Sequence, residues 1–261
     1  MSALSRPERQ LAERYLAARR DRTLAVLEGF HAIKHSLRFG AALLHVAASD
    51  PAELERLATS LAPDLSGRFE QLVELVTPAA LGSFGPSAPR TGVMAIARRP
   101  HSDVDALLAC AEPSPVVFLE DTRNPFNIGA CVRVAAAADV AGVLTTSMHD
   151  PWHPDALRGA AGLHFALPVL GLRQLPRSDR QLIALAPEGE PLNAAALSPR
   201  ALLAFGTERD GLSDALLERA DARVALPMRA GVSSLNLATS VAAVLYSWRL
   251  AASASHPEGT D

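Results

Sequence analysis

The sequence has two cysteines, one lysine and no long hydrophobic run. Cys110 and Cys131 are too few for a disulfide framework or a multi-cysteine zinc site, and we interpret both as small buried hydrophobic residues. A membrane span needs about 20 consecutive apolar residues, and no segment approaches that length. The first residues are charged where a secretory signal would be apolar. We therefore expect a soluble, cytoplasmic protein with no membrane partner.

Several common catalytic patterns are also missing. The sequence contains no G-x-G-x-x-G, G-x-x-x-x-G-K-[ST], G-x-S-x-G or H-E-x-x-H. No sequence motif therefore favours a dinucleotide-binding enzyme, a P-loop protein, a serine hydrolase or a zincin-type protease.

The formal net charge is -3, which by itself argues against a nucleic-acid partner because phosphate binding favours a positive surface. The distribution of charge weakens that argument, since residues 1–38 contain eight basic and four acidic side chains. This segment either presents a basic face or forms a solvated helix surface on which arginine alternates with glutamate.

Length and composition favour two domains. The 261 residues are 49% hydrophobic, which is enough for a substantial core. Residues 1–100 mix helical and strand-like segments and predict a small α/β domain, in which Asp50 and Pro51 begin a helix. Pro100, just before residues 101–115, and Pro115 at their end indicate that this segment is a linker. The tail, residues 253–261, is predicted to be disordered.

Residues 116–252 have a regular pattern in which short apolar runs alternate with helical stretches. This pattern predicts a buried parallel sheet with crossover helices. The runs lie at residues 116–119, 142–146, 181–186 and 201–205. Three polar clusters follow strands of this sheet, and parallel α/β sheets bind ligands at the carboxyl ends of their strands. We therefore expect the three clusters to form one site.

The first cluster, NPFNIGACVR, contains Asn127, Gly129 and Arg133. Asn127 is placed to cap a helix, and Gly129 allows a ligand or another backbone to approach closely. Arg133 lies two turns into an otherwise apolar helix, where a buried guanidinium would need an anion or a hydrogen-bond network. The alternative is that its long side chain extends to solvent.

The second cluster, FGTERDGLS, places Gly206 and Gly211 on either side of Glu208. One interpretation is a loop in which Ser213 caps the next helix. The other is a glycine-lined backbone edge against a ligand, with Glu208 holding a cation or an arginine in place.

The third cluster, LPMRAGVSSLN, precedes a long apolar helix. Ser234 and Asn236 present a hydroxyl and an amide at the helix start, where backbone N–H groups lack partners, although capping needs only one of them. Leu226, Met228 and Leu235 offer apolar surface of the kind that encloses an adenine ring.

In order and spacing, NIGACVR, FGTERDGLS and LPMRAGVSSLNLATSVA resemble the three signature motifs of SpoU/TrmH RNA ribose 2′-O-methyltransferases. The resemblance spans roughly residues 115–250, and the preceding part is similar to a ribosomal-protein-like RNA-binding domain often fused to this family. It implies an α/β parallel sheet with a C-terminal deep trefoil knot, an exception to the rule that chains are unknotted. It also implies a homodimer whose active site is completed across the subunit interface.

The resemblance implies a function for individual residues of the motifs. Arg133 matches an arginine that helps to activate the ribose 2′-hydroxyl, and Asn127 matches an asparagine that supports the site. Because a guanidinium stays protonated, we expect Arg133 to orient phosphate and stabilise the alkoxide rather than act as a base. Glu208 matches the acidic residue of the second motif, and Ser234 and Asn236 match a pair near cofactor and substrate.

The implied cofactor is S-adenosylmethionine. Gly206, Leu226 and Leu235 match positions that hold it largely through backbone contacts, while Ala186 is expected to line the same crevice and Met228 to add apolar surface. No metal is expected, because the methyl donor already carries its leaving group.

The chain departs from the family after the first motif. Many relatives have Arg-x-Ser-x-Gly there, whereas residues 158–162 read RGAAG and lack the serine. Contact of Arg158 with RNA or with the partner subunit is left open. His149, His153 and Asp155 lie nearby, and we interpret their segment as a proline-stiffened surface loop rather than a metal site.

The principal hypothesis is therefore S-adenosylmethionine-dependent 2′-O-methylation of structured rRNA or tRNA. The alternatives are a catalytically silent RNA-binding or ribosome-assembly protein on the same fold, and base methylation by that fold.

Overall fold

The computed structural model describes residues 4–65, 67–68, 72–207 and 209–255. The chain divides into two compact units. The first unit comprises Met1–His101 and Trp152–Ala166, and the second comprises Ser102–Pro151 and Leu167–Asp261. Within the described ranges, no helix is both long enough and apolar enough to traverse a lipid bilayer.

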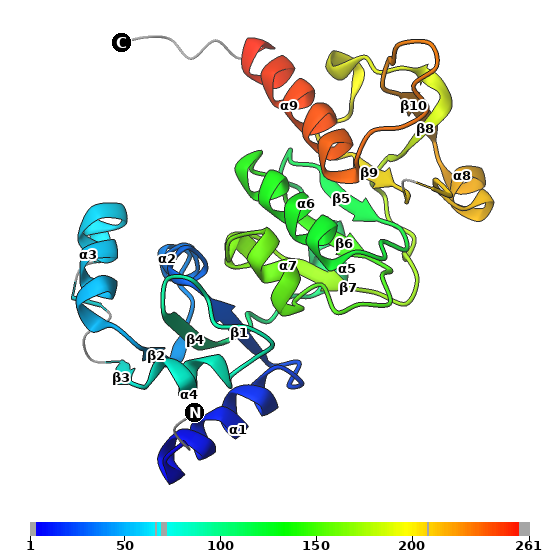
Figure 1. Cartoon of the computed structure of the whole chain (residues 1–261). Helices are drawn as coiled ribbons and strands as arrows, with labels where there is room; N and C mark the ends of the chain where they lie inside the picture. The colour runs from blue at the N-terminus through cyan, green and yellow to red at the C-terminus, as the bar shows by residue number, and fades with distance from the viewer. Residues whose placement is uncertain (1–3, 66, 69–71, 208, 256–261) are drawn as a thin grey trace, which may run out of the picture. The chain divides into compact units, whose positions relative to one another are not determined.

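The first unit contains a four-stranded mixed sheet with the order β1-β4-β2-β3 (Figure 1). β1 and β2 are antiparallel to β4, and β3 is parallel to β2. A core that includes Tyr15, Phe84 and Met94 joins α1 and α4 to the sheet. The strands are β1 (Leu24–Glu28), β2 (Leu43–Ala48), β3 (Val73–Leu75) and β4 (Val93–Arg98). The helices are α1 (Arg6–Ala18), α2 (Phe30–Arg38), α3 (Pro51–Leu61), a 3-10 turn η1 (Pro63–Leu65) and α4 (Pro78–Gly82). The helix predicted to begin after Asp50 is confirmed, and the Asp50 side chain accepts a hydrogen bond from the Glu53 backbone N–H.

The first unit also holds α7 (Pro154–Gly159) and the 3-10 turn η2 (Leu163–Phe165). Glu28, whose side chain is only 4% exposed, accepts hydrogen bonds from Arg19 and Arg158 on its two carboxylate oxygens. A buried carboxylate is costly unless it is paired, and here two arginines share it. Arg158, which the sequence left open for RNA or a partner subunit, thus has a partner within its own unit.

The second unit contains a six-stranded sheet with the order β10-β8-β9-β5-β6-β7, in which every pairing is parallel. Its strands are β5 (Val116–Leu119), β6 (Gly142–Thr145), β7 (Val169–Gly171), β8 (Leu182–Pro191), β9 (Leu202–Phe205) and β10 (Ala222–Ala225). The four predicted strand runs and their parallel arrangement are confirmed. β7 and β10 were not predicted, because β7 has only three residues and Arg223 interrupts the apolar residues of β10.

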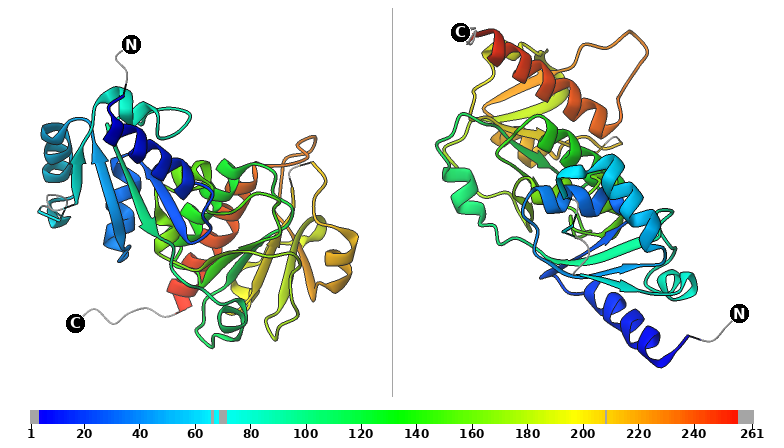
Figure 2. Two further views of the ribbon diagram at one scale, coloured as in Figure 1. Left: turned by 90° about the horizontal axis from the view of Figure 1, so that it is seen from below. Right: turned by 90° about the vertical axis from the view of Figure 1, so that its left-hand side faces the viewer.

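Helices cover both faces of this sheet. Val116 and Phe118 face a core to which α5 (Val104–Ala109) and α8 (Asp214–Arg219) contribute leucines. Val117 and Leu119 point to the opposite face by strand alternation. There α6 (Pro125–Ala137) and α9 (Leu237–Ser255) pack side by side (Figure 2). The short turn η3 (Ala194–Ala196) contacts α9.

The predicted domain boundaries differ from the structure in three places. The expected linker, residues 101–115, includes α5, whose Leu107 and Leu108 are buried in the core of the second unit. Residues 152–166 belong to the first unit although they lie between β6 and β7 in the sequence. The expected disordered tail begins inside α9, because that helix continues to Ser255, and its residues 256–261 lie outside the described part of the chain.

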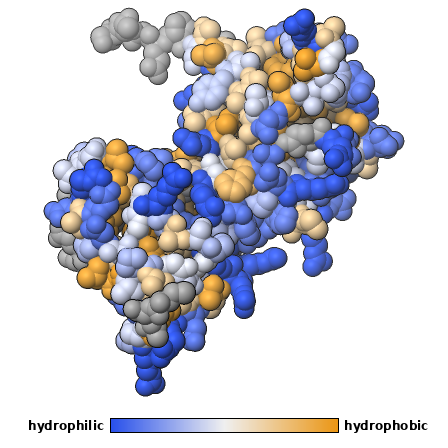
Figure 3. Space-filling model, in the orientation of Figure 1, coloured by the Kyte–Doolittle hydropathy of each residue, from blue (hydrophilic) through white to orange (hydrophobic). Residues whose placement is uncertain are grey.

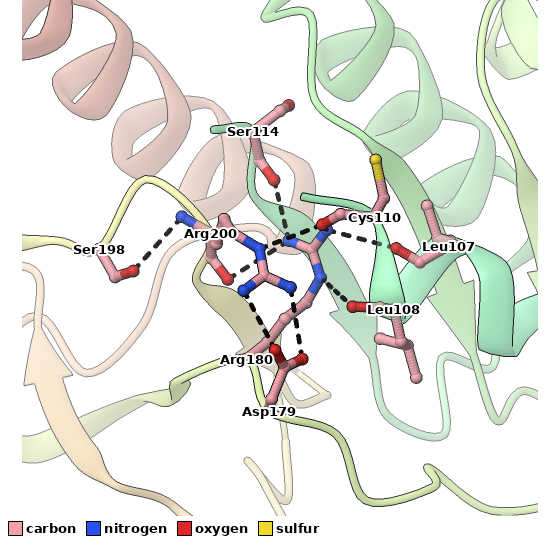
Figure 4. A network of polar contacts seen from close by, with 8 residues as sticks. All are labelled: Leu107, Leu108, Cys110, Ser114, Asp179, Arg180, Ser198 and Arg200. Carbon is pink, nitrogen blue, oxygen red and sulfur yellow. Dashed lines mark hydrogen bonds and ion pairs between the residues drawn. The ribbon is translucent and has the colours of Figure 1, made fainter. Parts of the chain in front are cut away.

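Arg180 joins the amino ends of three neighbouring strands (Figure 4). Its side chain is buried, and it donates five hydrogen bonds of 2.9 to 3.3 Å to backbone carbonyl oxygens. These oxygens belong to Leu107, Leu108, Cys110, Ser114 and Arg200. Three of them lie at the carboxyl end of α5, where a helix leaves its last carbonyls without partners. Burial lowers the pKa of Arg180 from its ordinary value.

We predict that Arg180→Met lowers the free energy of unfolding by about 3 kcal/mol, because several buried carbonyls lose their donor at once. Urea denaturation followed by circular dichroism measures the change. Arg177→Ala is the matched control, since Arg177 is exposed and should cost less than about 0.5 kcal/mol. Equal stability of the two variants would show that the carbonyl network contributes nothing.

Candidate active site

A cavity of about 420 Å³ lies at the carboxyl ends of β8 and β9. The segment that joins β10 to α9, residues 226–236, forms its other wall. All five residues expected to contact the cofactor line it, together with one expected near the substrate: Ala186, Gly206, Leu226, Met228, Leu235 and Ser234. The structure thus brings together residues that are up to 49 positions apart in the sequence, from Ala186 to Leu235.

Gly206 allows the backbone to fold tightly beside this cavity. A Cβ atom at this position would lie 2.0 Å from the carbonyl carbon and oxygen of Gly211. The Thr207 and Gly211 backbones exchange two hydrogen bonds of 3.1 and 3.0 Å, which close the loop between them. Gly211 has a positive φ of 68°, a conformation that favours glycine. Both glycines are therefore required by the fold of the loop itself. Ser213 caps α8 by accepting a hydrogen bond from the Leu216 backbone N–H, which confirms the first interpretation of this cluster.

The 226–236 wall exposes apolar side chains. Met228 is 37% exposed, Leu235 is 39% exposed, and Val232 between them is 48% exposed. Apolar side chains left open beside a cavity favour an apolar ligand surface over a purely ionic one. Polar groups of Thr207 and Asp210 line the same space.

Asn127 and Asn236 lie side by side, as expected for one site. The Asn236 amide Nδ2 donates to the Asn127 Oδ1 at 3.4 Å. The Asn236 Oδ1 also accepts from the Ala238 backbone N–H at 3.0 Å, so this side chain caps α9 as well. Asn127 itself is not a helix cap. Asn124 caps α6 instead, because Pro125 occupies the first helical position and places Asn127 within the first turn.

Arg133 does not line the cavity of its own chain. It is exposed on α6 and has no hydrogen bond or ion pair with any residue that the structure describes. Arg133 is six positions after Asn127 in the helix, so the two side chains point in directions that differ by about 240° around the helix axis. Of the two interpretations of this arginine, extension to solvent is the one that the structure supports.

Glu208 lies outside the described residues. Asp210 and Glu188, which sequence reasoning did not select, line the cavity. Asp210 belongs to the FGTERDGLS cluster, so that motif could have identified it. Glu188 lies in β8 outside the three clusters, and no motif points to it.

The segment around His153 does not form a metal site. His153 caps α7 by accepting a hydrogen bond from the Asp155 backbone N–H at 3.2 Å. Across the described ranges, no group of three or more histidine, cysteine, aspartate and glutamate side chains is placed to hold a metal ion.

The model of the SpoU rRNA methylase family matches residues 114–246, which include β5 to β10, both cavity walls and α6. The chain belongs to the SpoU rRNA methylase family. All three polar clusters lie inside the matched region, and the matched segment also includes residues 152–166 of the first unit.

Curated SpoU-type relatives align over part of their length. An uncharacterized tRNA/rRNA methyltransferase of Synechocystis is 36% identical over 142 residues, which cover 51% of this chain and 52% of the relative. A 23S rRNA (guanosine-2′-O-)-methyltransferase, RlmB, of Xylella fastidiosa is 31% identical over 188 residues, covering 67% and 76% respectively. The chain spans little more than half the length of the first of these relatives.

A solved SpoU structure has the same fold. The methyltransferase AviRb of Streptomyces viridochromogenes, crystallised with AdoMet, superposes with a TM-score of 0.73 at 21% identity, over 92% of this chain and 97% of that one.

Proposed function

We propose that this protein transfers a methyl group from S-adenosylmethionine to a ribose 2′-hydroxyl of structured rRNA or tRNA. The observation that carries the proposal is the cavity at the ends of β8 and β9, which brings the second and third family motifs together. The relative from Xylella is named as a guanosine 2′-O-methyltransferase, which favours ribose over base.

The cavity fits the cofactor in size and in chemistry. Its volume of about 420 Å³ lies within the range of small-molecule sites. Leu226, Met228 and Leu235 would enclose the adenine, and Gly206, which has no side chain, would present its backbone to the ligand. Bound there, S-adenosylmethionine supplies an electrophilic methyl group on a sulfonium that is its own leaving group.

The chain's own polar residues would position and activate the acceptor hydroxyl. A ribose hydroxyl is a weak nucleophile, so in-line placement and stabilisation of developing negative charge carry the reaction. Ser234 lines the cavity, and Asn236, which lies between the cavity-lining Leu235 and Leu237, donates to Asn127; we assign these side chains to orienting the ribose. We assign Glu208, by its motif position, to holding a cation or an arginine in place.

We also propose a homodimer in which Arg133 reaches the site of the other subunit. On α6, Phe126, Arg133 and Ala137 are exposed at spacings that place them on one helix face. On α9, Tyr246 is 43% exposed and Leu250 is 69% exposed. Figure 3 shows apolar surface over the region of α6 and α9. A dimer would cover these side chains and give the free guanidinium of Arg133 a substrate phosphate to bind.

Two finer assignments accompany this proposal. The first unit would bind RNA, supported by the exposed arginines Arg20, Arg22 and Arg98. Arg98 lies opposite Leu24 in the β1–β4 register, and Leu24 is two residues after Arg22. The segment from β8 to α9 would form the family's trefoil knot, supported by β10 lying at the sheet edge while α9 returns to pack on α6.

Mapping of 2′-O-methylated nucleotides in rRNA and tRNA, from cells with and without the gene, tests the function. We expect one site to disappear when the gene is deleted, because a ribose methylase acts on a defined nucleotide. If every site persists and calorimetry detects no S-adenosylmethionine binding, a silent RNA-binding protein replaces this proposal. A lost base methylation with intact ribose methylation would identify the third alternative.

We expect Arg133→Ala to lower methyl transfer at least 100-fold and to leave cofactor affinity unchanged, since it removes charge stabilisation outside the cofactor cavity. Single-turnover transfer and calorimetry measure the two effects. Arg223→Ala is the matched control, because Arg223 is exposed and lines no cavity described above. Near-normal transfer by Arg133→Ala would refute the assigned role.

Leu250→Asp should convert the dimer to a monomer, because a carboxylate would be buried in the apolar contact. Light scattering coupled to size-exclusion chromatography gives the mass. Ser253→Asp, one helical turn farther along α9 near its end, is the control. A dimeric Leu250→Asp protein would show that α9 is not the interface.

A further inference from the structure

A second cavity lies in the same unit, beside the one assigned to the cofactor. It has a volume of about 650 Å³ and extends along the carboxyl ends of β9, β5, β6 and β7. Four residues of one loop line both cavities: Thr207, Asp210, Gly211 and Leu212. A ligand in the second cavity would therefore lie directly across this loop from the cofactor cavity.

Arginine is the main basic group of this second cavity. Arg123, Arg173 and Arg219 line it from three different elements. A smaller pocket beside it shares Arg219 and adds Arg177. The two pockets together present four arginines along one edge of the sheet.

The carboxylates of the cavity already have partners. Arg123 lies 3.6 Å from the Asp121 carboxylate and 3.3 Å from that of Asp210. Glu120 accepts hydrogen bonds of 2.7 Å from the Ser213 backbone N–H and hydroxyl, where α8 begins. These carboxylates are thus engaged within the loops and do not pair with Arg173 or Arg177.

Arg173 and Arg177 are exposed and form no hydrogen bond or ion pair with the residues that the structure describes. Their loop is nevertheless held in place. Arg219 donates from both terminal nitrogens to the carbonyl oxygens of Leu175 and Pro176, at 3.1 Å each. The guanidinium groups of Arg173 and Arg177, which have no partner among the described residues, therefore lie on either side of this anchored backbone segment.

We propose that Arg173 and Arg177 bind backbone phosphates of the RNA whose target ribose enters the neighbouring cavity. This inference rests on the proposed function and adds a phosphate site on the catalytic unit. Guanidinium groups match phosphate in charge and in bidentate geometry. RNA fits better than a small metabolite, because the two arginines lie on an open edge rather than within an enclosed pocket.

The test compares RNA binding by wild type and the double variant Arg173→Ala/Arg177→Ala. The probe is a fluorescein-labelled 20-nucleotide RNA hairpin, titrated at several salt concentrations. Each phosphate contact contributes about 0.7 to 0.9 to the slope of log affinity against log salt. We expect the slope of the double variant to decrease by about 1.5, with cofactor affinity unchanged. Arg223→Ala, on β10 and outside both cavities, should retain the wild-type slope.

An unchanged slope and affinity in the double variant would overturn the inference. Normal hairpin binding combined with weaker binding of inorganic pyrophosphate would also overturn it, because the site would then serve a free anion. The proposed function fails separately: a wild type that binds the hairpin through these arginines but methylates no rRNA or tRNA would retain the phosphate site and lose the activity.

Discussion

The loop from Thr207 to Leu212 is the constraint on which both cavities of the second unit depend. It forms a wall of each, and it folds so tightly that Gly206 cannot carry a side chain. Any Cβ there would overlap the Gly211 carbonyl and displace the wall toward one cavity or the other. The missing side chain therefore allows the close backbone approach on which this shared wall depends, and the same loop carries Asp210 and its partner Arg123.

In the parallel sheet, the Arg180 contacts that stabilise the fold lie at the amino ends of the strands, and the cavities lie at the carboxyl ends. At the amino ends, Arg180 lies two residues before β8. It donates hydrogen bonds to the carbonyl oxygens of Ser114 and Arg200, next to β5 and β9. At the carboxyl ends, the loops after β5, β9 and β10 carry the motifs and leave polar groups open to the cavities. Parallel strands place all their carboxyl ends at one edge, so the second and third clusters line one cavity, and the first meets the third through the Asn127–Asn236 hydrogen bond.

Much of this arrangement follows from the sequence, because buried parallel strands require continuous apolar runs, which β5, β6, β8 and β9 have. Two features do not follow, and a third was available in the sequence but was misassigned. β10 is as long as β5, but Arg223 interrupts its apolar residues. The assignment of residues 152–166 to the first unit depends on contacts such as Arg158 with Glu28. The cap of α6 was misassigned to Asn127, although Pro125 marks the first helical position and indicates Asn124.

Net charge is the wrong quantity for judging whether this chain binds RNA. A sum of -3 counts every arginine alike, yet Arg19 and Arg158 neutralise a buried glutamate and Arg180 serves backbone carbonyls. Those guanidinium groups cannot contact phosphate without a loss of stability. Arg133, Arg173 and Arg177 are exposed and uncommitted among the described residues, so they carry the charge that an RNA would meet. An arginine's function is set by the partners that the fold gives it, and only a structure identifies those partners.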